Sequence, residues 1–223
     1  MHVRLKKLSL AINKVNEIVK QKQLKTKPKI IVVTKKFSMD KIIPLIKAGH
    51  IDYGENKVQE AEDKWLTIKK NYNNLKLHLV GKLQSNKAKK AVKLFDYIHS
   101  LDNAKLASKI FQYQNELNKK VKLFISVNLG EEEQKSGISL NELNNFYEYC
   151  TKELLLNIIG LMCLPPIGEN SHEYFKILKN SADELNLNRL SMGMSSDFEQ
   201  AIICGATHLR LGTIIMGERE SIK

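Results

Sequence analysis

Short apolar segments alternate regularly with stretches of helical periodicity along this chain, and the alternation restricts the fold to few classes. Eight such segments occur in the 223 residues, at 30–33, 51–53, 77–80, 97–99, 121–127, 158–161, 189–191 and 208–211. Strands that alternate with helices predict a parallel α/β fold. Eight repeats favour a single closed (β/α)8 barrel of the TIM type, and periodicity alone leaves an open doubly wound sheet as the alternative.

Apolar stripes at helical spacing predict the elements between these strands. Helices are expected at residues 39–48, 103–117, 141–151, 171–185 and 196–203, with an extra N-terminal helix at 3–19. Two further helices are expected to begin after the second and third strands, because Asn56, and either Ser85 or Asn86, are suitable N-cap residues.

The charge of the chain is high but dispersed. The net charge is +12, yet only four of the 36 basic residues are arginine, and aromatic residues make up 7% of the chain. A nucleic-acid interface more often clusters arginine and interleaves aromatic rings, so no nucleic-acid partner is expected. A basic protein that binds RNA or a membrane surface is the competing hypothesis, and a steep salt dependence would support it.

Cysteine and histidine spacing argues against a metal. Cys150, Cys163 and Cys204 form no CxxC pair, and no second histidine lies at metal spacing from His78. We expect reduced core thiols and a core histidine.

The chain has no apolar run near the roughly 20 residues that span a bilayer, and its start lacks the apolar core of a secretory signal. A cytoplasmic protein without a membrane partner is therefore expected.

Lys35 follows the first apolar strand directly, at the end where barrels place their functional groups. A lysine amine can hold an aldehyde as a Schiff base when a second site anchors the rest of that aldehyde. The alternative is that Lys35 and Lys36 are solvated lysines that leave a strand.

Two late segments are suited to hold a phosphate. Residues 191–196 and 210–213 follow the seventh and eighth strands, where barrels commonly bind phosphate. Ser195 or Ser196 is expected to cap a helix, and Gly212 and Thr213 offer backbone amides and a hydroxyl. Arg210 can donate a hydrogen bond to a pyridine nitrogen. The alternative for Arg210 is a surface salt bridge with Glu218 or Glu220.

A set of motifs that runs in order across nearly the whole chain resembles the pyridoxal phosphate homeostasis protein family. These motifs are VVTKK (32–36), YGENKVQEAEDKW (53–65), HLVGKLQSNKAK (78–89), VNLGEEEQKSGI (127–138), GLMCLPP (160–166), LSMGMSSDFEQAI (190–202) and RLGTIIMGER (210–219). The resemblance implies one barrel domain over residues 1–223, like the N-terminal domain of alanine racemases. It implies a protein that binds pyridoxal 5'-phosphate (PLP) and helps to balance vitamin B6 and amino-acid pools.

The resemblance also implies roles for single residues. Lys35 would carry PLP as an aldimine, and Arg210 would face the pyridine nitrogen. The residues implied to surround the rest of the cofactor are Asn56, Met192, Met194, Ser195, Gly212 and Thr213. Lys135 in the KSG motif would be a second amine for handling PLP.

Two departures from the family limit what is carried over. Lys82 stands where relatives often have proline, and the C-terminal sequence stops short of the basic tail of some relatives, so a transfer step that uses that tail is not expected. We expect a non-catalytic, monomeric PLP carrier, with PLP-dependent apo-enzymes as its partners. The alternative is a PLP-dependent amino-acid racemase, which would need a tyrosine from a second domain or a partner chain.

Overall fold

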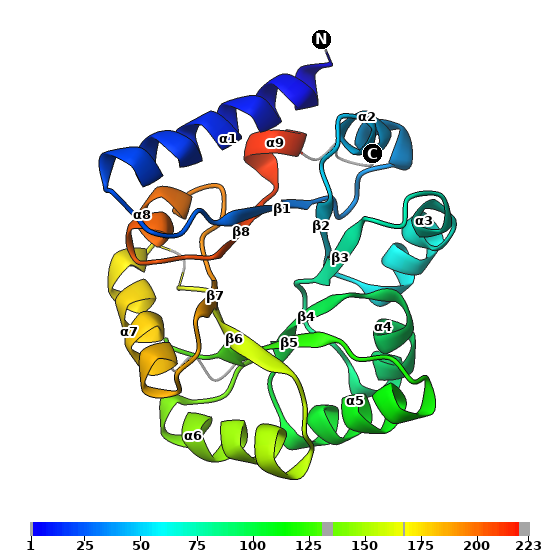
Figure 1. Ribbon diagram of the computed structural model, residues 1–223, viewed down its shortest axis with the longest axis vertical. Helices are drawn as coiled ribbons and strands as arrows, with labels where there is room; N and C mark the ends of the chain where they lie inside the picture. The colour runs from blue at the N-terminus through cyan, green and yellow to red at the C-terminus, as the bar shows by residue number, and fades with distance from the viewer. Residues whose placement is uncertain (1, 131–135, 167, 219–223) are drawn as a thin grey trace.

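The computed structural model describes residues 2–130, 136–166 and 168–218, and its strands form a closed barrel (Figure 1). Within these residues eight parallel strands follow in chain order: β1 (Lys29–Val33), β2 (Asp52–Glu55), β3 (Lys76–Leu79), β4 (Tyr97–Leu101), β5 (Lys122–Val127), β6 (Ile158–Cys163), β7 (Arg189–Ser191) and β8 (His208–Leu211). β8 returns to pair with β1, with Ile31 opposite Arg210. The predicted (β/α)8 barrel is confirmed, and the open sheet is wrong.

Helices separate the strands and surround the barrel (Figure 1). They are α1 (Val3–Gln21), α2 (Met39–Lys47), α3 (Val58–Asn71), α4 (Ala88–Leu94), α5 (Ala104–Glu116), α6 (Leu140–Glu148), α7 (Ser171–Glu184), α8 (Phe198–Ile203) and α9 (Thr213–Met216). A 3₁₀ turn (Ser85–Lys87) precedes α4, and a π-helical turn (Tyr149–Glu153) extends α6. The expected helices are found within a few residues, and α9 was not expected.

The expected N-caps of α3 and α4 are wrong. Lys57 occupies the N-cap position of α3, and Lys87 occupies that of α4, where Asn56 and Ser85 or Asn86 were expected. Neither position shows a side-chain cap bond. Asn56 remains outside α3 because the chain continues in extended form to Lys57, which leaves the Asn56 side chain directed to the end of the barrel.

The main core lies between the strands and the ring of helices. Trp65 of α3, Phe95 after α4 and Phe175 of α7 are fully buried against it. The strands are buried on both faces, as expected for a parallel barrel covered by helices. The inward face of the barrel contains an unexpectedly polar layer, which includes the buried histidines His78, His99 and His208. The prediction that His78 is a core histidine is confirmed.

The helix α1 covers the place where the barrel closes. It packs against α9, α8 and α2, so it spans the outer side of the β8–β1 pair (Figure 1). The Arg4 Nε atom of α1 donates to the Met216 carbonyl of α9 at 3.1 Å. The first and last helices therefore stabilise the same seam.

A close approach of two backbones gives a stability prediction at Gly160. A Cβ atom on Gly160 of β6 would lie 2.0 Å from the Arg189 carbonyl oxygen of β7. Gly160→Ala should therefore lower the free energy of unfolding by about 1–3 kcal/mol, the usual cost of overpacking. Urea unfolding measures it, and Gly212→Ala is the control, because a Cβ at Gly212 lies 3.7 Å from its nearest neighbour. An unchanged Gly160→Ala midpoint would contradict the close contact.

Two features of the described residues bear on membranes and metals. Among the described residues, no helix has both the length and the apolarity to cross a bilayer. The same part of the chain holds no cluster of three or more histidine, cysteine or acidic residues that could bind a metal. The three cysteines are free, Cys150 and Cys163 in the core and Cys204 half-buried.

Candidate functional site

A cavity of about 550 Å³ opens at the carboxyl ends of the strands. Seven of the eight residues expected at the cofactor line it: Lys35, Asn56, Met194, Ser195, Arg210, Gly212 and Thr213. The remaining lining residues are Val33, Val80, Leu164 and Ser196. Residues from both ends of the chain thus meet in one cavity, because β8 closes on β1.

Lys35 lies in a tight turn directly after β1. The Thr34 amide still follows the barrel pairing and donates to the Gly54 carbonyl at 2.9 Å, and the Phe37 amide donates back to the Thr34 carbonyl at 3.1 Å. Lys36 has a φ of +65° and an exposed side chain. The turn therefore separates the two lysines, since Lys35 is half-buried in the cavity wall and Lys36 faces solvent.

A group of charged residues on β2 and α3 holds this turn, and we call Glu55, Glu60 and Lys64 the turn clamp. The Lys64 ammonium donates to the Thr34 carbonyl at 2.8 Å and to the Phe37 carbonyl at 3.2 Å. It also pairs with Glu55 at 2.7 Å and with Glu60 at 2.9 Å. The Lys36 amide donates to Glu60. The turn that carries Lys35 is therefore fixed at two carbonyls and one amide.

Glu55 is the buried centre of the turn clamp. Its Oε1 atom accepts hydrogen bonds from the Thr34 hydroxyl at 2.7 Å and from the Trp65 indole at 3.0 Å. Burial raises the pKa of Glu55, and Lys64, Trp65 and Thr34 oppose that rise. The sequence did not predict the turn clamp, although the Glu60–Lys64 spacing of four residues is a recognisable sign of a helical ion pair.

Another part of the cavity wall is built after β7 and β8. Gly193 has a φ of +90°, a conformation that favours glycine, and it turns the chain so that Met194 and Ser195 reach the cavity. The Ser195 hydroxyl accepts a hydrogen bond from the Ile214 amide at 3.3 Å, which joins this loop to α9. Gly212 is the N-cap residue of α9.

Neither serine caps α8, contrary to the sequence expectation. Asp197 occupies the N-cap position of α8, and its Oδ1 atom accepts from the Met194 amide at 2.6 Å. Its Oδ2 atom accepts from the Ser171 hydroxyl at 3.2 Å. The aspartate holds the loop in shape, and this leaves Ser195 and Ser196 on the cavity wall.

Arg210 is a buried cation at the floor of the cavity. It is 5% exposed, and it donates from Nη1 to the Ser191 hydroxyl at 2.7 Å and from Nη2 to the Cys163 carbonyl at 2.9 Å. Burial lowers the pKa of Arg210, but a guanidinium remains charged at neutral pH. The alternative of a surface salt bridge with Glu218 is wrong because the side chain lies inside the barrel. Glu220 lies outside the described residues.

Met192 and Lys82 do not line this cavity. Met192 is fully buried in the main core and is not among the side chains that line the cavity, whereas Met194 does line it. Lys82 is exposed and borders a smaller neighbouring cavity of about 280 Å³. Lys135 lies outside the described residues.

The donor set of the cavity suits a small aldehyde that also carries an anionic group. The wall of the cavity offers the Lys35 amine, the Ser195 and Thr213 hydroxyls and the backbone at Gly212. The guanidinium of Arg210 has five N–H groups, of which two make the bonds described above. The volume falls within the usual range for small-molecule sites. PLP, with an aldehyde, a ring nitrogen and a phosphate, fits these residues.

Comparison with known proteins identifies the family. The family profile described as "Alanine racemase, N-terminal domain" matches residues 11–220. A pyridoxal phosphate homeostasis protein of Synechocystis is 40% identical over 202 residues, which are 86% of this chain and 91% of the relative. The chain belongs to the pyridoxal phosphate homeostasis protein family. Another family member, from Aquifex aeolicus, is 40% identical over 177 residues, 75% of this chain and 77% of its own.

Solved structures agree with this family and with its fold. PipY of Synechococcus elongatus is 34% identical, with a TM-score of 0.81, over 91% of this chain and all of that chain. The same protein has also been solved with PLP bound, and that structure has a TM-score of 0.80. An alanine racemase of Clostridium difficile, at 16% identity and a TM-score of 0.68, covers 95% of this chain and 57% of its own, and it shows the shared fold alone.

Proposed function

We propose that this chain binds PLP at the cavity and acts in vitamin B6 and amino-acid homeostasis as a carrier rather than as a catalyst. PLP supplies an aldehyde that bonds reversibly to an amine. The observation that carries the proposal is the convergence of Lys35, Arg210 and Ser195 on one cavity at the carboxyl ends of the strands. The name of the relatives and the PLP-bound form of PipY support it.

Each residue of the cavity has a role in this proposal. The Lys35 amine would hold the aldehyde carbon through a C=N bond formed with loss of water, and the turn clamp holds the turn that carries Lys35. Ser195, Gly212 and Thr213 hold the phosphate through hydroxyl and amide donors. Arg210 donates to the ring nitrogen and keeps it unprotonated, because a guanidinium cannot accept a proton.

Further surroundings of the cofactor follow from the same placement. Asn56 lies beside the cofactor. Both Met192 and Met194 were expected beside the ring, and Met194 alone is proposed there, because it lines the cavity. We propose that residues 1–223 act as one domain, as a monomer in the cytoplasm, with PLP-dependent apo-enzymes as recipients. The free cysteines suit a reducing compartment.

A trapping experiment tests the proposed function. The purified protein is mixed with PLP, its visible absorption spectrum is recorded, and borohydride is added to make the bond to the protein permanent. Peptide mapping should then find one pyridoxyl group, on Lys35. A protein that takes up no PLP, or that is labelled at scattered surface lysines alone, would refute the proposal. The basic-surface hypothesis would then be tested through the salt dependence of RNA and vesicle binding.

The residues proposed to hold the phosphate, which we call the phosphate anchor (Ser195, Gly212 and Thr213), give a separate prediction. Ser195→Ala and Thr213→Val should each weaken PLP binding by about 1–2 kcal/mol, because each removes one hydroxyl hydrogen bond to a charged group. Equilibrium titration measures the effect. Pyridoxal, which has no phosphate, is the matched control ligand, and its affinity should not change. Equal losses for both ligands would place the two hydroxyls elsewhere than at the phosphate.

Racemisation is the second candidate function, and the match to the alanine racemase N-terminal domain supports it. The protein loaded with PLP is incubated with L-alanine, and the D-enantiomer is measured by chiral chromatography. Turnover that disappears with Lys35→Arg would establish an enzyme. No turnover, together with PLP on Lys35, would support the carrier.

A further inference from the structure

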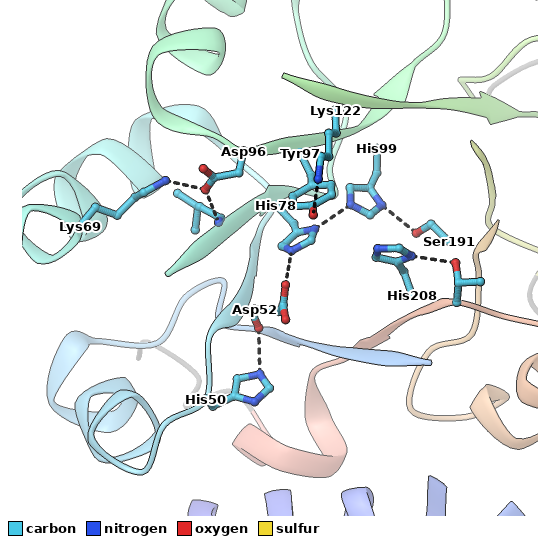
Figure 2. Close-up of polar contacts among 12 residues, drawn as sticks. His50, Asp52, Lys69, His78, Asp96, Tyr97, His99, Lys122, Ser191 and His208 are labelled. Atoms are coloured by element: carbon cyan, nitrogen blue, oxygen red, sulfur yellow. Dashed lines mark hydrogen bonds and ion pairs between the residues drawn. The ribbon is translucent and has the colours of Figure 1, made fainter. Parts of the chain in front are cut away.

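A line of buried polar side chains crosses the inside of the barrel and ends at Arg210. Asp52 of β2, His78 of β3, His99 of β4 and Ser191 of β7 form this line, and we call these four residues the interior chain (Figure 2). Figure 2 shows the two imidazoles directed toward each other, with Asp52 at one end and Ser191 at the other. Arg210 continues the line from Ser191 into the cavity of the site.

Every link of the interior chain has the length of a hydrogen bond. The Asp52 Oδ1 atom lies 3.0 Å from His78 Nε2, and His78 Nδ1 lies 3.0 Å from His99 Nε2. His99 Nδ1 lies 2.8 Å from the Ser191 hydroxyl, which accepts from Arg210 at 2.7 Å. His78, His99 and Ser191 are fully buried. Water therefore does not compete for these bonds.

The two histidines are neutral at pH 7. Burial lowers the pKa of His78, and the hydrogen bond to Asp52 opposes that effect. Burial and the neighbouring His78 lower the pKa of His99 well below its usual range. A neutral imidazole has one donor and one acceptor nitrogen, so each ring passes a hydrogen bond in one direction only.

The Asp52 end of the interior chain sets the direction of its hydrogen bonds. Burial alone would raise the pKa of Asp52, but the hydrogen bond from His78 and the nearby charge of Lys29 lower it, so Asp52 is ionised and only accepts. His78 must then donate from Nε2 and accept at Nδ1, and His99 must accept at Nδ1 from the Ser191 hydroxyl. Arg210 only donates, so the Ser191 oxygen must accept from it.

Aromatic contacts fix the ring planes. His78 stacks on Tyr97 with centroids 4.2 Å apart, and His99 stacks on Phe124 with centroids 4.3 Å apart. These contacts hold each ring at the orientation that its two hydrogen bonds need. The interior chain thus orients, from β3 and β4, the Ser191 hydroxyl that accepts from the Arg210 guanidinium.

We propose that His99 and Ser191 are positioning residues that, through the interior chain, hold Arg210 in register with the ring nitrogen of the bound cofactor. The inference rests on the proposed function. It assigns to the buried polar layer a part in ligand recognition. Without the interior chain, Arg210 keeps its charge and its bond to the Cys163 carbonyl, but it loses the oriented Ser191 hydroxyl as its second acceptor. The protein then no longer distinguishes a ring nitrogen from a carbon at that position.

A pair of ligands and a pair of matched variants test this inference. The ligands are PLP and the PLP analogue that has C–H in place of the ring nitrogen. Wild type should bind PLP about tenfold more tightly than the analogue, as expected for a hydrogen bond from a charged donor. His99→Phe keeps a stacking ring and removes both nitrogens, and the preference should fall to about twofold or less. The ratio cancels any change that affects both ligands equally.

His208→Phe is the control, because His208 lies beside the interior chain and also contacts Phe124, yet its described hydrogen bond goes to Thr207. This variant should retain the tenfold preference. Ser191→Ala removes one hydroxyl and should lose the preference even if His99→Phe does not fold. Equal preferences in wild type, His99→Phe and Ser191→Ala overturn the inference. No uptake of PLP by wild type would instead refute the proposed function.

Discussion

Lys35→Arg is expected to abolish the borohydride-stable pyridoxyl label and the visible absorption band of the loaded protein. The substitution keeps a positive charge at the mouth of the cavity, but a guanidinium stays protonated and does not attack an aldehyde. PLP should still bind, more weakly, through Ser195 and Thr213. Absorption spectra, peptide mapping and equilibrium titration measure the three effects. The loss of label should be complete, since Lys35 is the one lysine among the described residues that lines the cavity.

Lys36→Arg is the matched control for this substitution. Lys36 is the next residue, is exposed, and leaves the turn in the opposite direction. Its replacement should leave the label, the band and the affinity unchanged. A Lys35→Arg protein that still forms the band would show that another amine bonds to PLP, and the assignment of Lys35 would be abandoned while the phosphate anchor could still be tested.

Lys64→Met is expected to have the largest effect on stability, about 3–5 kcal/mol, because it leaves the buried Glu55 without its ion-pair partner. The Glu55 side chain is fully buried, and that of Lys64 is 12% exposed. The variant also removes the donor to the Thr34 and Phe37 carbonyls, so the turn that carries Lys35 should loosen and PLP affinity should fall. Urea unfolding and PLP titration measure the two effects.

The stability deficit of Lys64→Met should depend on pH. Burial raises the pKa of Glu55 above its ordinary value of 4.5, and loss of Lys64 raises it further. The folded variant then binds a proton more tightly than the unfolded chain, so its stability falls as the pH rises from about that value. The deficit relative to wild type is therefore smaller at pH 5 than at pH 8. A deficit that is the same at both pH values would contradict an ionised Glu55 at the centre of the turn clamp.

Lys69→Met provides the comparison for Lys64→Met. Lys69 lies on the same helix and pairs with Asp96 at 2.6 Å, but these two side chains are 20% and 26% exposed. Water compensates for the loss of that pair, so the expected cost is smaller, with no effect on PLP affinity. Similar costs for both variants would show that burial of Glu55 is not the cause.

The strands were predictable because a parallel barrel buries both faces of each strand, and the resulting apolar runs are distinct even when only three residues long. The helix caps were less predictable, since Lys57 and Lys87 hold N-cap positions without a side-chain bond. At those positions tertiary packing, rather than local capping, determines where the helix begins.

The residues that line the cavity were largely predictable, but the buried residues that hold them in place were not. Barrel topology places Lys35 and Gly212 at the same end of the sheet, and both line the cavity. Alternation along residues 190–196 could not separate Met192 from Met194, because the positive φ of Gly193 interrupts it. The interior chain could not be predicted, since its members come from four strands and meet only after the barrel has closed.

Closure of the barrel also has a consequence for the order of folding. The residues that pair across the β1–β8 seam, such as Ile31 and Arg210, are about 180 residues apart, so this contact forms late and slowly. During synthesis the edge of β1 that pairs with β8 stays unpaired until β8 has been made. A ligand held between Lys35 and Thr213 would bridge both sides of the seam and stabilise the closed form by mass action. Binding of PLP should slow amide hydrogen exchange more in β1 and β8 than in β4 and β5. That result would show that the cofactor stabilises the closure of the barrel.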